Sequence, residues 1–302
     1  MSERGKLRIG TRGSALALWQ ANAVAALLAQ QGRGSELITI RTTGDRIQDR
    51  PLSEAGGKGL FVKEIEDALL AGTLDVAVHS AKDMSVAIPA GLAVAAVLPR
   101  EDPRDALVLR EGHPLSSAAA IGTGSVRRSA QLAVRLPGAR FLPVRGNVDT
   151  RLRKLDAGEF DALILAVAGL TRLGYGARVS EAIPLEDCIP APGQGIIAVE
   201  TRADLADDRV WRAIDHAATA AAFQAERAVV EALGGGCQLP LGAIAVHEDG
   251  GVVVHAIVTS PDGRRRVRTT VRGAPDDPAG LGRRAAAELA DGGAIDILNS
   301  LR

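Results

Sequence analysis

The sequence predicts an α/β fold with mainly parallel sheets, followed by a small α+β domain with an antiparallel sheet. Short aliphatic strands alternate with helical segments over most of the chain, which is typical of a sheet covered by helices. Clusters of polar residues follow several of these strands, where open α/β sheets bind their ligands. The last strands instead alternate in polarity and are joined by tight turns. A length of 302 residues allows two or three domains.

The composition excludes several classes of protein. Hydrophobic residues make up 46% of the chain but aromatic residues only 2%, so the cores are expected to be aliphatic. Basic and acidic residues balance at 36 each, which provides no overall field for nucleic acid or an anionic membrane. The 2 cysteines cannot build a disulfide framework. With no apolar leader and no run near the ~18 residues of a membrane span, a soluble cytoplasmic protein is expected.

The first domain is expected to comprise residues 1–99 and 196–214. Its predicted elements are a strand at 7–11, a helix at 15–31, a strand at 36–42, a helix at 60–70, strands at 74–78 and 92–98, and a returning strand at 196–200. Ser14 is placed to cap the first helix. The apolar face of that helix is expected to hold Leu16, Trp19, Ala23 and Leu27. The polar segment 43–59 is long for a connection, which favours a functional loop.

The second domain, residues 100–195, is expected to repeat the α/β pattern. Its predicted elements are strands at 120–123, 141–144 and 162–167, with helices that begin near Gly124 and Arg145. The charged, proline-containing segment 99–105 is interpreted as the crossover into this domain, and the segment 190–195 as the crossover back.

The third domain, residues 215–302, is expected to begin with a helix at 219–233. Strands at 243–247, 252–259 and 265–271 follow, with turns at Asp249-Gly250-Gly251 and Pro261-Asp262-Gly263, and a closing helix at 278–289. This order predicts an antiparallel sheet flanked by helices.

Arginine recurs where predicted strands lead into helices. The residues concerned are Arg12, Arg127, Arg128, Arg145, Arg151 and Arg172. Helix N-termini already favour anions, and guanidinium groups bind carboxylates and phosphates as forks. Any one of these arginines could simply be solvated. Their recurrence at equivalent positions predicts a cleft for a ligand with many anionic groups.

Two further stretches contain side chains that could take part in a reaction. Asp83 follows a strand in His79-Ser80-Ala81-Lys82-Asp83, and could act as a general acid/base or form a surface ion pair. Cys237 follows three glycines, Gly234–Gly236, which could cap a helix beside an inert buried cysteine or leave a reactive thiol accessible. Cys188 lacks such a setting and is interpreted as structural. No P-loop or dinucleotide fingerprint is complete, and the histidines show no metal-ligand spacing.

These stretches, in this order, closely resemble the porphobilinogen deaminase family almost from end to end. The motifs concerned are Arg8–Arg12, Gly56-Gly57-Lys58-Gly59-Leu60-Phe61, His79–Asp83, Arg100–Asp105, Gly122–Arg128, Arg145-Gly146-Asn147 and Gly235-Gly236-Cys237-Gln238. The resemblance implies two α/β domains like those of periplasmic binding proteins, plus the small C-terminal domain. It also implies an enzyme that joins four porphobilinogen molecules, releases ammonia, and then releases hydroxymethylbilane by hydrolysis.

The resemblance implies a site as well as an activity. A dipyrromethane cofactor would be bound through a thioether to Cys237, and Asp83 would be the catalytic carboxylate. The implied cofactor-binding residues are Cys237, Ser80, Lys82, Asp83, Thr123, Ser125, Arg127, Arg128, Arg145 and Gly146. The implied substrate-binding residues are Arg12, Ser14, Gln20, Lys58, Phe61, Arg145, Arg151, Arg172 and Gln194. Lys58 and Phe61 would belong to a lid, where Glu54 replaces a lysine of some members.

Two alternatives remain beside the transferase. A two-lobed binding module of the periplasmic type would also clamp anions between α/β lobes, and an inactive relative could serve as a scaffold. The resemblance implies no metal, no nucleic acid and no membrane, but a monomer that passes its product to uroporphyrinogen-III synthase. Intact mass separates the enzyme from the binding module, because only the enzyme carries a dipyrromethane. The scaffold is disfavoured because Asp83, Cys237 and the arginines are all present.

Overall fold

The computed structural model describes residues 5–46, 61–235 and 239–301. The chain forms two compact units, Met1–Arg100 with Ile196–Ala220, and Glu101–Gly195 with Ala221–Arg302. The boundary between them falls within helix α8 (Ala217–Ala232). Within the described ranges, no helix is both long and apolar enough to cross a bilayer.

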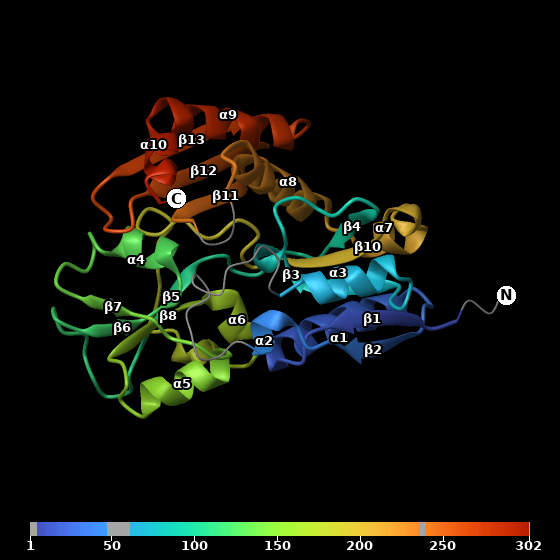
Figure 1. Cartoon of the computed structure of the whole chain (residues 1–302), viewed down its shortest axis with the longest axis horizontal. Coiled ribbons are helices and arrows are strands. Elements are labelled where there is room, and N and C mark those ends of the chain that lie inside the picture. The colour runs from blue at the N-terminus through green and yellow to red at the C-terminus, as the bar shows by residue number, and fades with distance from the viewer. Residues whose placement is uncertain (1–4, 47–60, 236–238, 302) are drawn as a thin grey trace. The chain divides into compact units, whose positions relative to one another are not determined.

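The first unit is built on a five-stranded sheet in the order β2-β1-β3-β10-β4 (Figure 1). Its strands are β1 (Leu7–Thr11), β2 (Ser35–Thr39), β3 (Val76–Ser80), β4 (Leu92–Val97) and β10 (Ile197–Arg202). Its helices are α1 (Ala15–Gln30), α2 (Thr43–Arg46), α3 (Lys63–Leu70), α7 (Arg209–Ile214) and the short η1 (Ala81–Asp83) and η3 (Ala203–Leu205). The returning strand β10 lies antiparallel between β3 and β4, while the other four strands run parallel, as predicted.

The second unit contains a sheet of the same kind, in the order β7-β6-β8-β5-β9. Its strands are β5 (Asp105–Leu109), β6 (Ala120–Gly122), β7 (Arg140–Leu142), β8 (Ala162–Ala166) and β9 (Glu181–Ala182). Its helices are α4 (Val126–Leu132), α5 (Val148–Asp156), α6 (Val167–Arg172) and the short η2 (Gly176–Arg178). Strand β5 runs against both β8 and β9, so again one strand opposes four.

Strand β5 corrects the prediction for the segment 99–105, which was interpreted only as a crossover. Asp105 is the first residue of β5 and is fully buried, as are Ala106 and Val108. An acidic residue at the start of a short apolar run resembles a loop in sequence, because its charge is normally exposed. Only buried partners make this position possible inside a sheet.

The C-terminal part of the second unit follows α8 with an antiparallel sheet in the order β11-β12-β13. The elements are β11 (Leu241–Glu248), β12 (Gly251–Thr259), β13 (Arg266–Gly273), α9 (Pro278–Asp291) and α10 (Ala294–Asn299). Asp249 and Gly250, with φ values of 47° and 78°, form the two-residue turn between β11 and β12 that their sequence predicted. Helix α9 packs against β12 and β13 (Figure 1).

The cores are aliphatic, as the composition predicted. In the first unit, Ile9, Val76 and Val199 from three adjacent strands pack against Val24 and Leu28 of α1. The buried stripe of α1 differs from the prediction, because Trp19 is 42% exposed and Gln20 is buried. An alanine-rich helix has little contrast between its faces, so packing rather than pattern selects the buried one.

Candidate active site

The end of β3 places three predicted site residues in the first unit. Ser80 closes the strand, and η1 follows directly with Lys82 and Asp83. The amide of Gln20, from α1, donates a hydrogen bond to Ser80 Oγ over 2.8 Å. The Asp83 side chain is half-buried and makes no hydrogen bond or ion pair with another described residue. Its carboxylate is therefore available for a ligand.

Arg12, at the end of β1, is oriented by two neighbours. Its Nε donates to Asp45 Oδ1 over 3.1 Å, and its guanidinium carbon lies 4.2 Å from the centre of the Phe61 ring. Burial alone would raise the pKa of Asp45, but the guanidinium of Arg12 outweighs it and lowers that pKa. Ser14 caps α1, as predicted, by accepting a hydrogen bond from the backbone of Ala17. Asp45 was missed by the sequence analysis, because one carboxylate in the polar segment 43–59 offers no distinguishing pattern in the sequence.

A buried carboxylate, Asp105, lies at the centre of the second unit's site. Arg127 Nη1 donates to Asp105 Oδ2 over 2.7 Å, and Arg128 Nε donates to Asp105 Oδ1 over 2.8 Å. The Gln194 amide donates to Asp105 Oδ1 over 2.9 Å and to the carbonyl of Pro103. Three predicted site residues are thus held by one carboxylate that the sequence analysis did not select. The sequence feature that could have identified Asp105 is a charged residue at the start of an apolar run.

The charges of this Asp105 cluster, namely Asp105, Arg127, Arg128 and Gln194, do not cancel. Burial raises the pKa of Asp105, but the charges of Arg127 and Arg128 outweigh this effect and lower the pKa below its ordinary range. The carboxylate is therefore ionised, and two guanidinium groups against one carboxylate leave one positive charge. Arg127 Nε is buried without a hydrogen-bond acceptor among the described residues. Both features suit an anionic ligand.

Cys188 touches the same cluster but is not a reactive thiol. Its Sγ lies 3.3 Å from Arg127 Nη1 and 3.3 Å from Asp105 Oδ2. Burial, together with the charge of Asp105, raises the pKa of Cys188 to about 12. The thiol is therefore protonated at neutral pH, which confirms its structural interpretation.

The remaining residues of the second unit lie at strand-to-helix junctions. Ser125 caps α4 by accepting a hydrogen bond from the backbone of Arg128, and its own N–H donates to Thr123 Oγ1. Gly146 has a φ of 109°, and an added Cβ would lie 2.6 Å from Thr150 Cγ2, so glycine is required there. Arg151 Nε donates to the carbonyl of Gly146 over 2.8 Å.

Two arginines of this unit are partly desolvated. Burial lowers the pKa of Arg145 and also that of Arg172, where the charge of Glu101 opposes the effect. Arg172 Nη2 donates to the carbonyl of Gly195, next to Gln194, over 2.7 Å. The guanidinium groups remain charged, and such partly buried cations attract carboxylates more strongly than exposed ones. The predicted residues Lys58 and Cys237, with Glu54, lie outside the described residues.

A buried acidic pair, Glu66 of α3 and Glu200 of β10, lies on the opposite face of β3 from Ser80. His79 Nε2 is 3.0 Å from Glu200 Oε2, and both side chains are buried. Glu66 of α3 is also buried, and burial with the nearby charge of Glu200 raises the pKa of Glu66 to about 7. Neither Glu66 Oε1 nor Glu200 Oε1 has a hydrogen-bond partner in the described ranges.

We expect this acidic pair to make the protein less stable as the pH rises. Below its unfolded pKa of about 4.3, Glu66 is protonated in both the folded and the unfolded protein. Above about pH 7 the folded protein must bury it as an anion. Between pH 5 and 8 the free energy of unfolding of the wild type should fall by roughly 1–3 kcal/mol relative to Glu66→Gln. Urea titrations at several pH values measure this difference. Asp207→Asn, a fully exposed position in the same unit, is the control, and equal pH dependence of wild type and Glu66→Gln would contradict the prediction.

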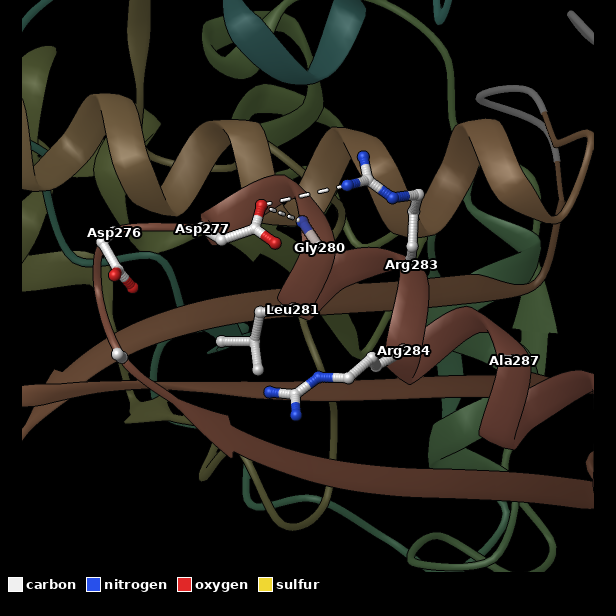
Figure 2. Close-up of a pocket in the computed structure, with 8 residues that line it drawn as sticks. Asp276, Asp277, Gly280, Leu281, Arg283, Arg284 and Ala287 are labelled. Atoms are coloured by element: carbon white, nitrogen blue, oxygen red, sulfur yellow. Dashed lines mark hydrogen bonds and ion pairs between the residues drawn. The ribbon is translucent and has the colours of Figure 1, made fainter.

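A surface hollow of about 530 Å³ lies elsewhere, on the C-terminal part of the second unit (Figure 2). Its walls come from α9 and the segment before it, and none of the predicted site residues lines it. Its charges serve the fold: Asp277 caps α9 through the N–H of Gly280 and lies 3.9 Å from Arg283 (Figure 2). Across residues 5–46, 61–235 and 239–301, no group of His, Cys, Asp or Glu is arranged to hold a metal ion.

Comparisons with known proteins identify relatives along the whole chain. Residues 7–210 match the family model described as "Porphobilinogen deaminase, dipyromethane cofactor binding domain", and residues 220–291 match "Porphobilinogen deaminase, C-terminal domain". A porphobilinogen deaminase from Ralstonia nicotianae is 47% identical, covering 98% of this chain and 92% of the relative. Another from Desulforudis audaxviator is 48% identical, covering 99% of both. A periplasmic substrate-binding protein from Coxiella burnetii is 14% identical with a TM-score of 0.41, covering 69% of this chain and 89% of that one.

Proposed function

Since the chain belongs to the porphobilinogen deaminase family, we propose that Asp83 is its catalytic carboxylate and Cys237 the attachment point of its cofactor. The protein is a hydroxymethylbilane synthase, which joins porphobilinogen molecules head to tail with loss of ammonia in tetrapyrrole synthesis. Family models covering 7–210 and 220–291 remove the alternative of a two-lobed binding module. The observation that best supports the role of Asp83 is its half-buried carboxylate without a described partner.

Asp83 would stabilise the positive charge that develops on the substrate's pyrrole nitrogen. As the aminomethyl carbon–nitrogen bond breaks, its electron pair leaves with ammonia and the ring becomes electron-poor. A carboxylate that accepts a hydrogen bond from the pyrrole N–H lowers the energy of this state. Once the carbon–carbon bond has formed, the Oδ atoms of Asp83 can take up the proton that a ring carbon releases.

The positively charged and hydroxyl side chains would bind the acetate and propionate groups of the pyrroles. Those proposed for the cofactor are Ser80, Lys82, Thr123, Ser125, Arg127, Arg128 and Arg145, with Gly146 beside them. Those proposed for the substrate are Arg12, Ser14, Arg145, Arg151 and Arg172. Gln20 and Gln194 would add polar groups to the same site, and Lys58 and Phe61 would belong to its lid. Forked guanidinium donors fix the orientation of a carboxylate as well as its position, so they can align a ring for reaction.

The residues of the second unit fit a dipyrromethane. This group carries carboxylates, and the Asp105 cluster has one uncompensated positive charge and an unpartnered buried donor, Arg127 Nε, within the described ranges. When bound, the dipyrromethane supplies the pyrrole to which the first substrate is joined. Arg127 and Arg128 would hold its carboxylates, and Cys237 would anchor it.

Intact mass tests the attachment. The purified wild-type chain is expected to be heavier than its sequence by one dipyrromethane, and Cys237→Ser is expected to lose that mass completely, since serine cannot form the thioether. Cys188→Ser is the matched control, because it removes the second of the 2 cysteines, whose thiol is buried and protonated. A Cys237→Ser chain that keeps the added mass would disprove the assignment.

Four further assignments complete the proposal. The domains would span 1–99 with 196–214, 100–195, and 215–302. The enzyme would act as a monomer in the cytoplasm and pass its product to uroporphyrinogen-III synthase. Light scattering of the purified chain tests the monomeric state, since a mass twice that of the chain would contradict it.

A further inference from the structure

Gln131, near the end of α4, exchanges two hydrogen bonds with the backbone of Ile189. Its Nε2 donates to the Ile189 carbonyl over 3.0 Å, and its Oε1 accepts from the Ile189 N–H over 2.7 Å. Only 2% of the residue is exposed. The buried amide therefore joins α4 to one residue that lies 58 positions further along the chain.

The same carbonyl also accepts a hydrogen bond from Arg127, which lies one turn earlier on the same face of α4. Arg127 Nη1 donates to the Ile189 carbonyl over 2.8 Å and to Asp105 Oδ2 over 2.7 Å. A third contact of Nη1 is with Cys188 Sγ. Arg127 Nε is buried without an acceptor in the described ranges. The guanidinium is therefore anchored at Nη1, and the direction in which Nε points depends on where the Ile189 carbonyl lies.

Ile189 is fixed from its other side by the C-terminal sheet of the same unit. Its side chain packs against Ile244 of β11 and Ile257 of β12. A Cβ added to Gly242, near the start of β11, would lie 2.5 Å from the Ile189 carbonyl oxygen and 3.1 Å from Gln131 Nε2. Strand β11 thus packs directly on the hydrogen-bonded pair, and any larger residue than glycine would displace this carbonyl.

Helix α4 needs such contacts because it is only 7 residues long. A helix of this length is not stable by itself, so contacts at its two ends decide where it lies. At its C-terminal end, Arg266 of β13 donates to the carbonyls of Gln131 and Ala130 over 2.7 and 3.2 Å, which satisfies acceptors that the last turn leaves free. Gln131 adds the link to Ile189. A shift of this end of the helix would also move Arg127, one turn away.

Glutamine suits this position because its amide matches the backbone that it faces. The Ile189 backbone offers one donor and one acceptor, and the amide offers one of each in return. Methionine has about the same length but forms neither bond, so the Ile189 N–H would lose its buried acceptor. Glutamate could still accept from this N–H, but its second oxygen would face the carbonyl oxygen. The two substitutions therefore break the link in different ways.

We propose that Gln131 is a positioning residue for cofactor binding: by fixing the Ile189 carbonyl, it sets the direction in which Arg127 Nε meets a carboxylate of the dipyrromethane. This inference rests on the proposed function, in which Arg127 holds such a carboxylate. Gln131 acts only through Arg127. Its effect is on how often the guanidinium and the carboxylate meet in the correct geometry.

The test follows the gain of mass by full-length, cofactor-free chain incubated with porphobilinogen, at a temperature well below every Tm. Gln131→Met is expected to gain the cofactor mass about tenfold more slowly than the wild type, as for other small misplacements of a binding group. Gln224→Met makes the same substitution at an exposed position of α8 and should load at the wild-type rate. Val271→Ala removes buried volume from β13, controls for lost stability, and should also load normally.

A double substitution separates positioning from a general structural effect. Arg127→Lys keeps a positive charge beside Asp105 but has no Nε donor, so it is expected to load about tenfold more slowly than the wild type. Because Gln131 acts through Arg127, adding Gln131→Met to Arg127→Lys should slow loading by less than about twofold further. A structural effect independent of Arg127 would slow both backgrounds by the same factor.

The possible failures of the positioning role and of the proposed function differ. Loading of Gln131→Met at the wild-type rate, equally slow loading of Val271→Ala, or the same slowing in both backgrounds would overturn the positioning role. A wild-type chain that gains no mass, or an Arg127→Lys chain that loads at the wild-type rate, would instead overturn the proposed cofactor binding and this inference with it. If Gln131→Met does not fold, Gln131→Glu replaces it in every comparison.

Discussion

Replacing Asp83 by asparagine is expected to lower kcat by about two to four orders of magnitude, the usual contribution of a positioned acid or base. Asparagine keeps the shape of the side chain but removes the negative charge that stabilises the electron-poor pyrrole. Because Asp83 is half-buried and has no partner among the described residues, the fold should not change. The rate of ammonia release measures the loss of kcat, and an unchanged Tm shows that the loss does not come from unfolding.

The comparison needs a second carboxylate that lies outside the site. Asp67, on α3, is exposed and pairs with Lys63. Asp67→Asn should therefore retain full turnover. A chain with Asp83→Asn that keeps more than a tenth of the wild-type kcat would contradict the catalytic role, because an amide cannot replace a charged carboxylate in it.

Replacing Asp105 by asparagine is expected to lower the free energy of unfolding by about 3–5 kcal/mol, the usual effect of breaking a buried ion pair. The change leaves Arg127 and Arg128 buried without a counter-charge, since only 4% and 7% of their side chains are exposed. It also weakens the bond from Gln194. Urea titration at pH 7 measures the difference.

Asp102→Asn is the matched control for this substitution. Asp102 also pairs with an arginine, Arg104, over 2.6 Å, but both side chains are partly exposed, so less than about 1 kcal/mol should be lost. The lowered pKa of Asp105 predicts stabilisation that is present above its unfolded pKa of about 4 and is lost as the pH falls below it. The difference between wild type and Asp105→Asn should therefore be constant from pH 5 to 8. Equal losses for the two substitutions would contradict the central position of Asp105.

The sequence allowed a prediction of most strands and of the turns in the last sheet, but not of β5 and β9. β3 and β10 begin with the short apolar runs 76–78 and 197–199, which favour a buried strand, and Asp249-Gly250 favours one hairpin geometry. The capping role of Ser14 was equally predictable, since it depends on neighbouring backbone groups. The pairing of β10 between β3 and β4 was expected only in part, because it joins segments more than a hundred residues apart.

The candidate site was predicted in its residue types but not in its internal partners. The arginines at strand ends were recognisable because anion binding at helix N-termini has a local signature. Asp105, which holds two of them, was part of a segment interpreted as a crossover. Nothing in its neighbourhood distinguishes a buried carboxylate from a solvated one, since the difference lies in Arg127, Arg128 and Gln194, which are distant along the chain.

By itself, the sequence determined the family, the α/β class and the chemical nature of the ligand, because these depend on local patterns and on the residue types present. Only the tertiary structure decided which charges are buried and what compensates them. Asp105 is ionised because two arginines surround it, and Glu66 has a raised pKa because it is buried and because Glu200 lies nearby. The carboxylate of Glu226 joins Gly193 to Ala245, which meet only after folding. Desolvation and pairing set the state of each carboxylate, and both arise from contacts that no local pattern encodes.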